Sequence, residues 1–485
     1  MGASSSGKSL LLKAISGRTQ ELNISGEFLL NGVMINPKDI SNSISYVPEE
    51  DFLCRNLSTR ETWRNSISLK NPYQVEIEGA LDALIDQFGL THFADKKIGD
   101  LSQDDITGEK KVRIKIGSEL ITAPSVLVLD GPTTGLNEAL AYGILRDVKD
   151  IMDRSQGDIS VIISVDQTNS KILELFDHIL IIGGGGMLFF GTVFESIQYF
   201  SSIGFRPPIH YTPTNYFLAV SDPNYGTEFD YDFEGSFTSS RFYIGVMKYI
   251  DSLKRYPWGK TSPKMSRDIV YRKSSSAQLG EISSVRSNSD IRSENVCSPD
   301  ISYSSSKLPK GPGWKQFLTL LKRNFVIAAR DPSLYYLQFA LSGGLGFVVG
   351  STFLSLKYEI ADNGQGPSAA ILWLTLISIY IQILKIPHLS RSNQLFRHEH
   401  SNQHYSVLPY FLADLLSSAL LLISVLPGVA LGYFLIGFPS KGFLFTMLVS
   451  WLVRTAFACV RLYRVPLLCT DTRLCRKGFP SMLTA

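Results

Sequence analysis

The stretch Gly2-Ala3-Ser4-Ser5-Ser6-Gly7-Lys8-Ser9 decides the fold of this chain, because it completes the pattern G-x-x-x-x-G-K-[ST]. In that pattern, backbone N–H groups close around the phosphates of a nucleoside triphosphate, the lysine reaches the β and γ oxygens, and the hydroxyl holds Mg²⁺. The apolar run from Leu10 to Ile15 follows directly and predicts the helix that such a loop opens. The residues that we expect to contact the nucleotide here are Gly2, Ser5, Ser6, Gly7, Lys8 and Ser9.

The position of this stretch is unusual. A phosphate loop follows a buried strand, and Met1 alone precedes Gly2. We therefore expect the first strand of the domain to be missing and the chain to be truncated at its N-terminus.

Composition indicates a protein with a membrane part. The chain has 485 residues, enough for two or three domains, and 44 % of them are hydrophobic. Its net charge of +3 is small for this length and argues against a nucleic-acid partner. The five cysteines lack metal-ligand spacing and are expected to be reduced thiols.

Residues 1–221 alternate short apolar runs with amphipathic stretches, which predicts a nucleotide-binding α/β domain. Within it, Val126–Leu129 and Ile159–Val165 are short, rich in β-branched residues and bounded by polar residues, as expected for buried parallel strands. The run Gly183–Gly186 favours a turn after a strand over a second phosphate site. Residues 222–310 are expected to be a Ser-rich linker without a fold of its own.

The rest of the chain predicts an α-helical membrane domain. Residues 311–333 have the period of an amphipathic connecting helix. Residues 334–460 contain four apolar stretches, each near or above the roughly 18–20 residues that cross a membrane. Their predicted bounds are 334–356, 369–387, 410–438 and 443–460. Residues 461–485 form an irregular basic tail that ends as abruptly as the chain begins.

A cytosolic ATP-binding cassette placed before a set of spans resembles the G subfamily of ABC transporters, the half-transporters of lipids, sterols and xenobiotics. The run from Ser125 to Leu136, with Asp130-Gly131-Pro132-Thr133-Thr134-Gly135-Leu136, looks like the second nucleotide motif of that family. The stretch from Ser392 to Tyr410 resembles the family's helix before the third span, and Thr91–Gly99 looks most like the sterolin pair of sterol exporters. Family members have six spans per half, so this chain is expected to be truncated at both ends.

The resemblance implies that this chain keeps the residues that bind MgATP but lacks residues that the family uses to hydrolyse it. Lys8, Ser9 and Asp130 match the family's ATP and Mg²⁺ ligands, with Asp130 holding the metal. Gly131 stands where the family places the glutamate that activates water, and Asp166 stands where it places a histidine on the γ-phosphate. An ionised carboxylate there repels phosphate. Glu49 replaces the glutamine that senses the metal and still has an oxygen for Mg²⁺.

The signature that contacts a partner's ATP is also altered. In the best register it is Thr107, Gly108 and Glu109, where Glu109 places a side chain and a negative charge at a position of close backbone approach. A register displaced by one residue remains open.

Together these residues predict a half-transporter subunit that binds MgATP, pairs as a homo- or heterodimer and exports a lipid-like substrate from a membrane, with the plasma membrane as its expected location. The alternative is a catalytically inactive pseudo-subunit that regulates a functional relative. A P-loop GTPase or kinase is disfavoured, because Asp130–Thr133 lacks the D-x-x-G glycine and no N-K-x-D motif appears.

Overall fold

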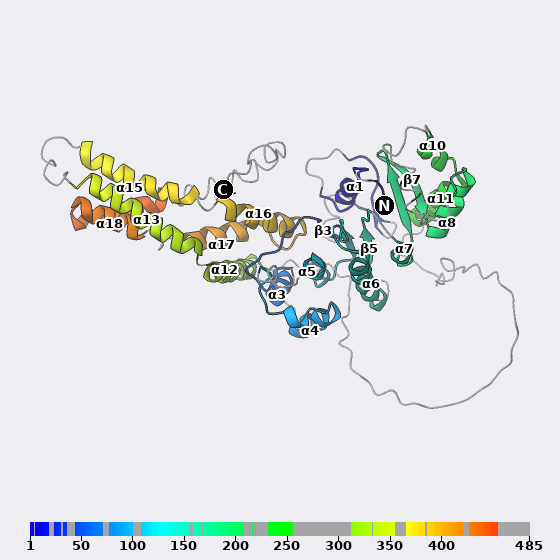
Figure 1. Cartoon of the computed structure of the whole chain (residues 1–485), viewed down its shortest axis with the longest axis horizontal. Helices are drawn as coiled ribbons and strands as arrows, with labels where there is room; N and C mark the ends of the chain where they lie inside the picture. Colours follow the sequence, from blue (N-terminus) through cyan, green and yellow to red (C-terminus); the bar gives the residue numbers. More distant parts are fainter. Residues whose placement is uncertain are drawn as a thin grey trace, which may run out of the picture. The chain divides into compact units, whose positions relative to one another are not determined.

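The chain forms two compact units in the computed structural model. Figure 1 labels its helices and strands along the chain. The first unit comprises Met1–Tyr46 and Val128–Ser305, and the second comprises Val47–Leu127 and Ser306–Ala485. The structure describes residues 1–3, 5–18, 24–30, 33–35, 44–70, 77–99, 108–155, 159–166, 169–207, 213, 216, 219, 231–255, 312–331, 333–354, 365–383, 386–420 and 426–453.

The first unit is an α/β domain, as its sequence predicts. Its helices are α1 (Lys8–Ile15), α6 (Glu138–Arg154), α7 (Ser170–Leu173), α8 (Val193–Ser202), α10 (Phe233–Thr238) and α11 (Arg241–Arg255). Its strands are β1 (Leu29–Leu30), β2 (Val33–Met34), β3 (Ile44–Val47), β4 (Val126–Leu129), β5 (Ser160–Ile163), β6 (Ile179–Gly183) and β7 (Gly186–Gly191), and the boundary between the units passes through β3 and β4.

One sheet has the strand order β3-β4-β5. Both predicted strands are confirmed within it, since β4 coincides with Val126–Leu129 and β5 lies inside Ile159–Val165. Every residue of β4 is buried, which explains its uninterrupted apolar run. β5 is only partly buried. The sheet brings the ends of β4 and β5 together, because the Ser164 N–H donates to the Leu129 carbonyl at 2.9 Å.

Strands β6 and β7 form an antiparallel hairpin. Its turn is the predicted glycine run, in which Gly184 and Gly185 have φ values of 58° and 86°, so both lie in the left-handed region that favours glycine. The other edge of β6 contacts the beginning of the chain: Ile182 N–H donates to the Met1 carbonyl at 2.9 Å, and Gly2 forms a parallel bridge with Ile182. The phosphate loop is thus attached to β6.

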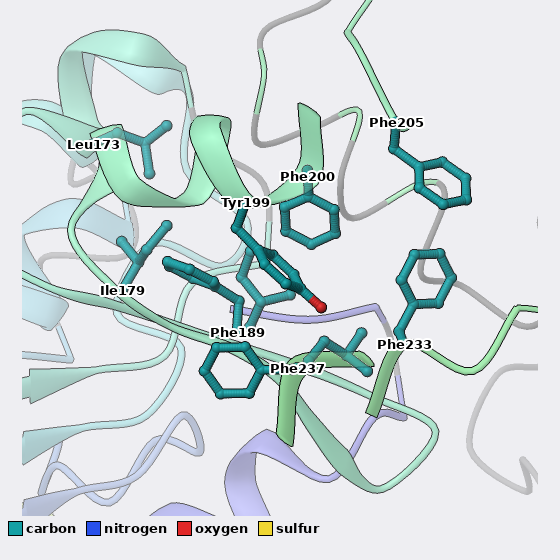
Figure 2. Packing of buried hydrophobic residues seen from close by; sticks show 10 residues of the cluster. Leu173, Ile179, Phe189, Tyr199, Phe200, Phe205, Phe233 and Phe237 are labelled. Atoms are coloured by element: carbon teal, nitrogen blue, oxygen red, sulfur yellow. The ribbon is translucent and has the colours of Figure 1, made fainter. Parts of the chain in front are cut away.

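An aromatic cluster forms the core between this hairpin and the helices α8 and α10 (Figure 2). Phe189 of β7, Tyr199 and Phe200 of α8, and Phe237 of α10 have side chains that are at most 1 % exposed. Two helices, α10 and α11, therefore lie where the sequence predicts a linker from residue 222, and that prediction is wrong over residues 233–255. Aromatic residues at 233 and 237 supply the apolar area that the Ser-rich stretch further on lacks. Residues 256–310 lie outside the described part.

The second unit is helical. Its elements are α3 (Thr59–Lys70), α4 (Ile77–Gln87), a short turn of helix at Thr91–Phe93, α5 (Gly108–Leu120), α12 (Gly313–Arg330), α13 (Ser333–Thr352), α15 (Gln365–Ile383), α16 (Ile386–Ser401), α17 (Val407–Leu420), α18 (Leu426–Ile436) and a final helix at Ser440–Val453. Helices α3 and α5 meet at Trp63, which is fully buried and donates through Nε1 to the Ile114 carbonyl at 3.0 Å. Gly117 leaves room for the Trp63 ring, because a β-carbon there would collide with it.

Small residues let α13 and α18 approach closely. On α13, small residues recur every four positions, at Ser342, Gly346 and Gly350. They face α18, on which Gly428 and Gly432 have the same spacing. The Gly428 N–H donates to Ser342 Oγ at 3.1 Å, and a β-carbon at Gly346 would meet the Gly428 carbonyl. This is the small-xxx-small packing typical of membrane helices.

The predicted spans coincide with helices, with one correction. Residues 334–356 correspond to α13 and 369–387 to α15, whereas the span predicted at 410–438 consists of two helices, α17 and α18. By length and hydropathy, no single helix within the described ranges qualifies as a membrane span, but Gly313–Arg330 and Tyr335–Thr352 qualify together as a pair bent by 71°. The end of the fourth predicted span and the tail at 461–485 lie outside the described residues.

Candidate functional site

The phosphate loop has the backbone that its glycines permit. Gly7, with φ at 96°, directly precedes α1, and Ser5 adopts φ at 66°, which is uncommon for a residue with a side chain. Gly2 is packed so closely that a β-carbon would meet the Ile182 carbonyl. Helix α1 begins at Lys8, so its free N–H groups point toward the loop.

Among the described residues, Lys8 has three partners. Its ammonium donates to the carbonyl oxygens of Gly2 at 2.8 Å and Ala3 at 2.7 Å. It also forms an ion pair with Asp166, at 3.0 Å between Nζ and Oδ1. Lys8 is 10 % exposed and Asp166 is 58 % exposed. The predicted phosphate ligand therefore contacts the residue that was expected to repel phosphate.

Asp130 lies at the end of β4 and is the acceptor of a hydrogen-bond network. Its Oδ1 accepts from Ser9 Oγ at 3.0 Å and from Ser164 Oγ at 2.8 Å, and its Oδ2 accepts from Tyr46 Oη at 2.9 Å. Asp130 is buried, and these bonds satisfy its carboxylate. Ser9 and Asp130, which the sequence assigns to one metal site, lie 121 positions apart in the sequence and are in hydrogen-bond contact in the structure.

This pair fits a magnesium ion. A hydroxyl and a carboxylate are the hard oxygen donors that Mg²⁺ prefers, and the Ser9–Asp130 contact places both beside one position. Ser9 and Asp130 would hold the ion, and bound Mg²⁺ would neutralise charge on the phosphate oxygens of a nucleotide.

No general base lies at the residue after Asp130. Gly131 has φ at 57°, in the left-handed region, and its N–H donates to Ser164 Oγ at 2.7 Å. A glutamate at this position would have to adopt that backbone at a cost of about 1 kcal/mol. The glycine therefore removes a catalytic side chain and also fits the local backbone.

The signature region is described only from Gly108 onward, and Thr107 lies outside the described residues. Gly108 is exposed and begins α5. The Glu109 carboxylate forms an ion pair with Arg113, one turn further along, at 2.9 Å. Arg113 thus offsets the negative charge that the sequence placed at the signature. Glu49, predicted as a metal ligand, belongs to the second unit and is exposed.

Within the second unit, α3 of the cassette contacts α12 through a two-bond ion pair. The Arg330 guanidinium donates to both Glu61 oxygens at 2.5 and 2.7 Å, and also to the Asn56 carbonyl at 3.0 Å. The hydrogen bond from Arg330, partly opposed by burial, lowers the pKa of Glu61 below its ordinary value of 4.5. The Glu61–Arg330 pair ties the cassette to the connecting helix.

We expect Glu61→Gln to destabilise this contact by about 1 kcal/mol at neutral pH. Because the pKa of Glu61 is lowered in the folded protein, its contribution is fully present above pH 4.5 and is lost as the pH falls below that value. Melting temperatures of the full chain in detergent should therefore differ between wild type and Glu61→Gln at pH 7 and converge below pH 4.5. Glu78→Gln, which removes an exposed carboxylate on α4, is the matched control. A gap that is constant with pH would contradict this prediction.

Two buried clusters of polar side chains connect helices of this unit. The first connects α12 with α16 and the loop after it, and the second connects α5 with α16. Arg323 and Glu399 form an ion pair at 2.6 Å with side chains 3 % and 7 % exposed, and the Tyr405 hydroxyl donates to Glu399 at 2.7 Å. Glu119 of α5 contacts His398 Nε2 at 2.9 Å. Burial on its own would raise the pKa of Glu119, but His404 and the hydrogen bond with His398 outweigh it and hold that pKa well below its ordinary value.

The sequence did not indicate several of these contacts. Tyr46 and Ser164 lie 84 and 34 positions from Asp130, so spacing gave no signal for them. The position of Ser164 directly after a predicted strand was the one available clue, since residues at strand ends line ligand sites in α/β sheets. The Lys8–Asp166 pair likewise required the fold.

Comparison with known proteins assigns the two parts of the chain. Residues 1–134 match the model of the ABC transporter family, and residues 315–462 match that of the ABC-2 type transporter family. The ABC transporter G family member 13 of Arabidopsis thaliana is 27 % identical, over 91 % of this chain and 64 % of the relative. The broad substrate specificity ATP-binding cassette transporter ABCG2 of Bos taurus is also 27 % identical, over 94 % and 68 %.

The ABC transporter G family member 22 of Dictyostelium discoideum is 28 % identical, over 85 % of this chain and 61 % of the relative. The chain thus spans about two thirds of the length of these curated relatives. The matches cover the cassette and the helical part in the order that the sequence predicts. The chain thus has an ABC transporter domain followed by an ABC-2 type transporter domain, and relatives that it resembles over most of its length are named members of the G family of ABC transporters.

Proposed function

We propose that this chain is the nucleotide-binding subunit of a half-transporter that works as a homo- or heterodimer and moves a lipid, sterol or xenobiotic across a membrane, the plasma membrane being the expected site. The order of its two domains supports this proposal. The name of the bovine relative, which refers to broad substrate specificity, supports an export substrate of loosely defined shape.

The nucleotide-binding part of the proposal rests on the positions of Lys8, Ser9 and Asp130 at the loop. Ser9 and Asp130 are in hydrogen-bond contact, and Lys8 lies at the loop itself. Bound MgATP would place its phosphates against the loop N–H groups and its metal on Ser9 and Asp130. Hydrolysis by this chain alone is slow, because Gly131 lacks the base that contributes about 10²–10⁴-fold to such reactions.

A second candidate function is a pseudo-subunit that pairs with a functional relative and regulates it. Two observations favour it. Gly131 supplies no base, and Asp166 forms an ion pair with Lys8, the residue that would contact the γ-phosphate. In this alternative the partner's own residues perform the ATP hydrolysis.

Co-expression with a G-subfamily half-transporter tests both functions. Membrane vesicles containing the partner alone, the partner with this chain, or the partner with Lys8→Ala would be compared for ATP hydrolysis and for export of a fluorescent lipid. We expect the wild-type chain to co-purify and to raise export, and Lys8→Ala to raise it less. Lower export with the wild-type chain would support the pseudo-subunit, and no co-purification with any family partner would contradict both.

A further inference from the structure

Among the described residues, the Lys8 ammonium donates hydrogen bonds to two loop carbonyls and forms an ion pair with Asp166. A lysine ammonium has three N–H donors, and Lys8 contacts three oxygen atoms, on Gly2, Ala3 and Asp166. Two of these contacts are to neutral carbonyls of the loop, whereas the third is to a carboxylate. A phosphate oxygen that approaches Lys8 must therefore displace Asp166 or share the ammonium with it.

Asp166 competes mainly with the terminal phosphate of a triphosphate. In a loop of this pattern the backbone N–H groups cradle the α- and β-phosphates, and the lysine extends to the β- and γ-phosphates. The Asp166 carboxylate lies 3.0 Å from the Lys8 ammonium. A γ-phosphate oxygen bound to that ammonium would lie at a similar distance from it. The carboxylate is anionic like the phosphate, so the two groups repel each other when both lie beside Lys8.

We propose that Asp166 makes this site selective for nucleoside diphosphates over nucleoside triphosphates, by holding Lys8 in the place of a γ-phosphate. The inference rests on the proposed nucleotide-binding function of the loop and names the nucleotide that the loop prefers. A diphosphate retains the backbone contacts of the loop and the metal position at Ser9 and Asp130, and it brings no third phosphate against Asp166.

The size of the effect follows from the exposure of Asp166. Unit charges at about 4 Å repel each other enough to weaken binding by roughly five-fold in water and several hundred-fold in a medium of dielectric constant 20. Asp166 is 58 % exposed, so solvent screens most of this repulsion. We expect a discrimination of about ten-fold between ADP and ATP.

The test is to measure the dissociation constants of ADP, ATP and the non-hydrolysable AMP-PNP with Mg²⁺ by calorimetry on the full chain in detergent. Wild type should bind ADP about ten-fold more tightly than ATP or AMP-PNP. Asp166→Asn, which keeps the shape and removes the charge, should strengthen triphosphate binding about ten-fold and change ADP binding little. Asp177→Asn is the matched control, because Asp177 is 61 % exposed and pairs with Lys149 at 3.2 Å on the same unit.

Two results would overturn the inference while leaving nucleotide binding intact. One is a wild type that binds ATP as tightly as ADP, with a ratio that Asp166→Asn changes no more than Asp177→Asn does. The other is an Asp166→Asn variant that binds both nucleotides more tightly by the same factor, which would mean that Asp166 does not distinguish the γ-phosphate. If neither wild type nor Asp166→Asn binds any of the three nucleotides, the proposed nucleotide-binding function is wrong, and the inference is overturned with it.

Discussion

Replacing Arg323 with alanine destabilises the second unit by about 3–5 kcal/mol, the expected loss when one member of a buried ion pair is removed. The Glu399 side chain is 7 % exposed in the wild type, and without Arg323 its remaining donor among the described residues would be the Tyr405 hydroxyl. Burial raises the pKa of Tyr405 well above its ordinary value, so the hydroxyl keeps its proton and donates to Glu399 at every usable pH. One neutral donor does not replace a guanidinium.

The measurement is the denaturant midpoint and the melting temperature of the full chain in detergent. Lys322→Ala is the matched control, since Lys322 is the exposed neighbour of Arg323 on α12. The double variant Arg323→Met with Glu399→Met should lose less than Arg323→Ala, because removing both charges leaves no unpaired group. An Arg323→Ala protein as stable as Lys322→Ala would contradict the prediction.

Replacing Lys8 with alanine weakens binding of ADP and ATP by about 10–100-fold. A hydrogen bond to a charged group contributes roughly 1.5–3 kcal/mol, which corresponds to that range. Lys13→Ala is the control, because Lys13 is exposed on the same helix and belongs to the same unit. Binding of a fluorescent ADP analogue, competed by ADP or ATP, gives both affinities.

A double-mutant cycle that combines Lys8→Ala with Asp166→Asn tests whether Asp166 affects ATP binding through Lys8. If Asp166 acts through Lys8, its substitution should improve ATP binding much less in the Lys8→Ala background than in wild type. Equal improvement in both backgrounds would show that Asp166 acts on phosphate directly. Lys8→Ala with wild-type affinity for both nucleotides would mean that the loop is not the nucleotide site.

Local elements were predictable because their signals are local. The strand at Val126–Leu129 and the connecting helix follow from runs and periods of a few residues. The strand occurs with its predicted bounds, and the helix occurs as Gly313–Arg330 within the predicted residues 311–333. The linker boundary was not predictable in this way. Residues 233–255 are helical within a polar region, where Phe233 and Phe237 join the aromatic cluster of β7 and α8.

The bounds of the apolar helices were only partly predictable. Hydropathy averages over a window, so it merged α17 and α18 into a single stretch at 410–438. The glycines that distinguish the packed face of α18, Gly428 and Gly432, have meaning only once α13 lies against them.

The sequence by itself indicated the two domains and their order, predicted the ligand types at Lys8, Ser9 and Asp130, and placed at 131 a glycine, which has no side chain to act as a base. Each of these is a matter of which side chain stands at which position of a motif. Only the tertiary structure decided that Asp166 pairs with Lys8, that Arg113 offsets the charge of Glu109, and that Arg323 is buried against Glu399. The physical reason is that an electrostatic effect depends on distance and burial, which a chain acquires only when it folds.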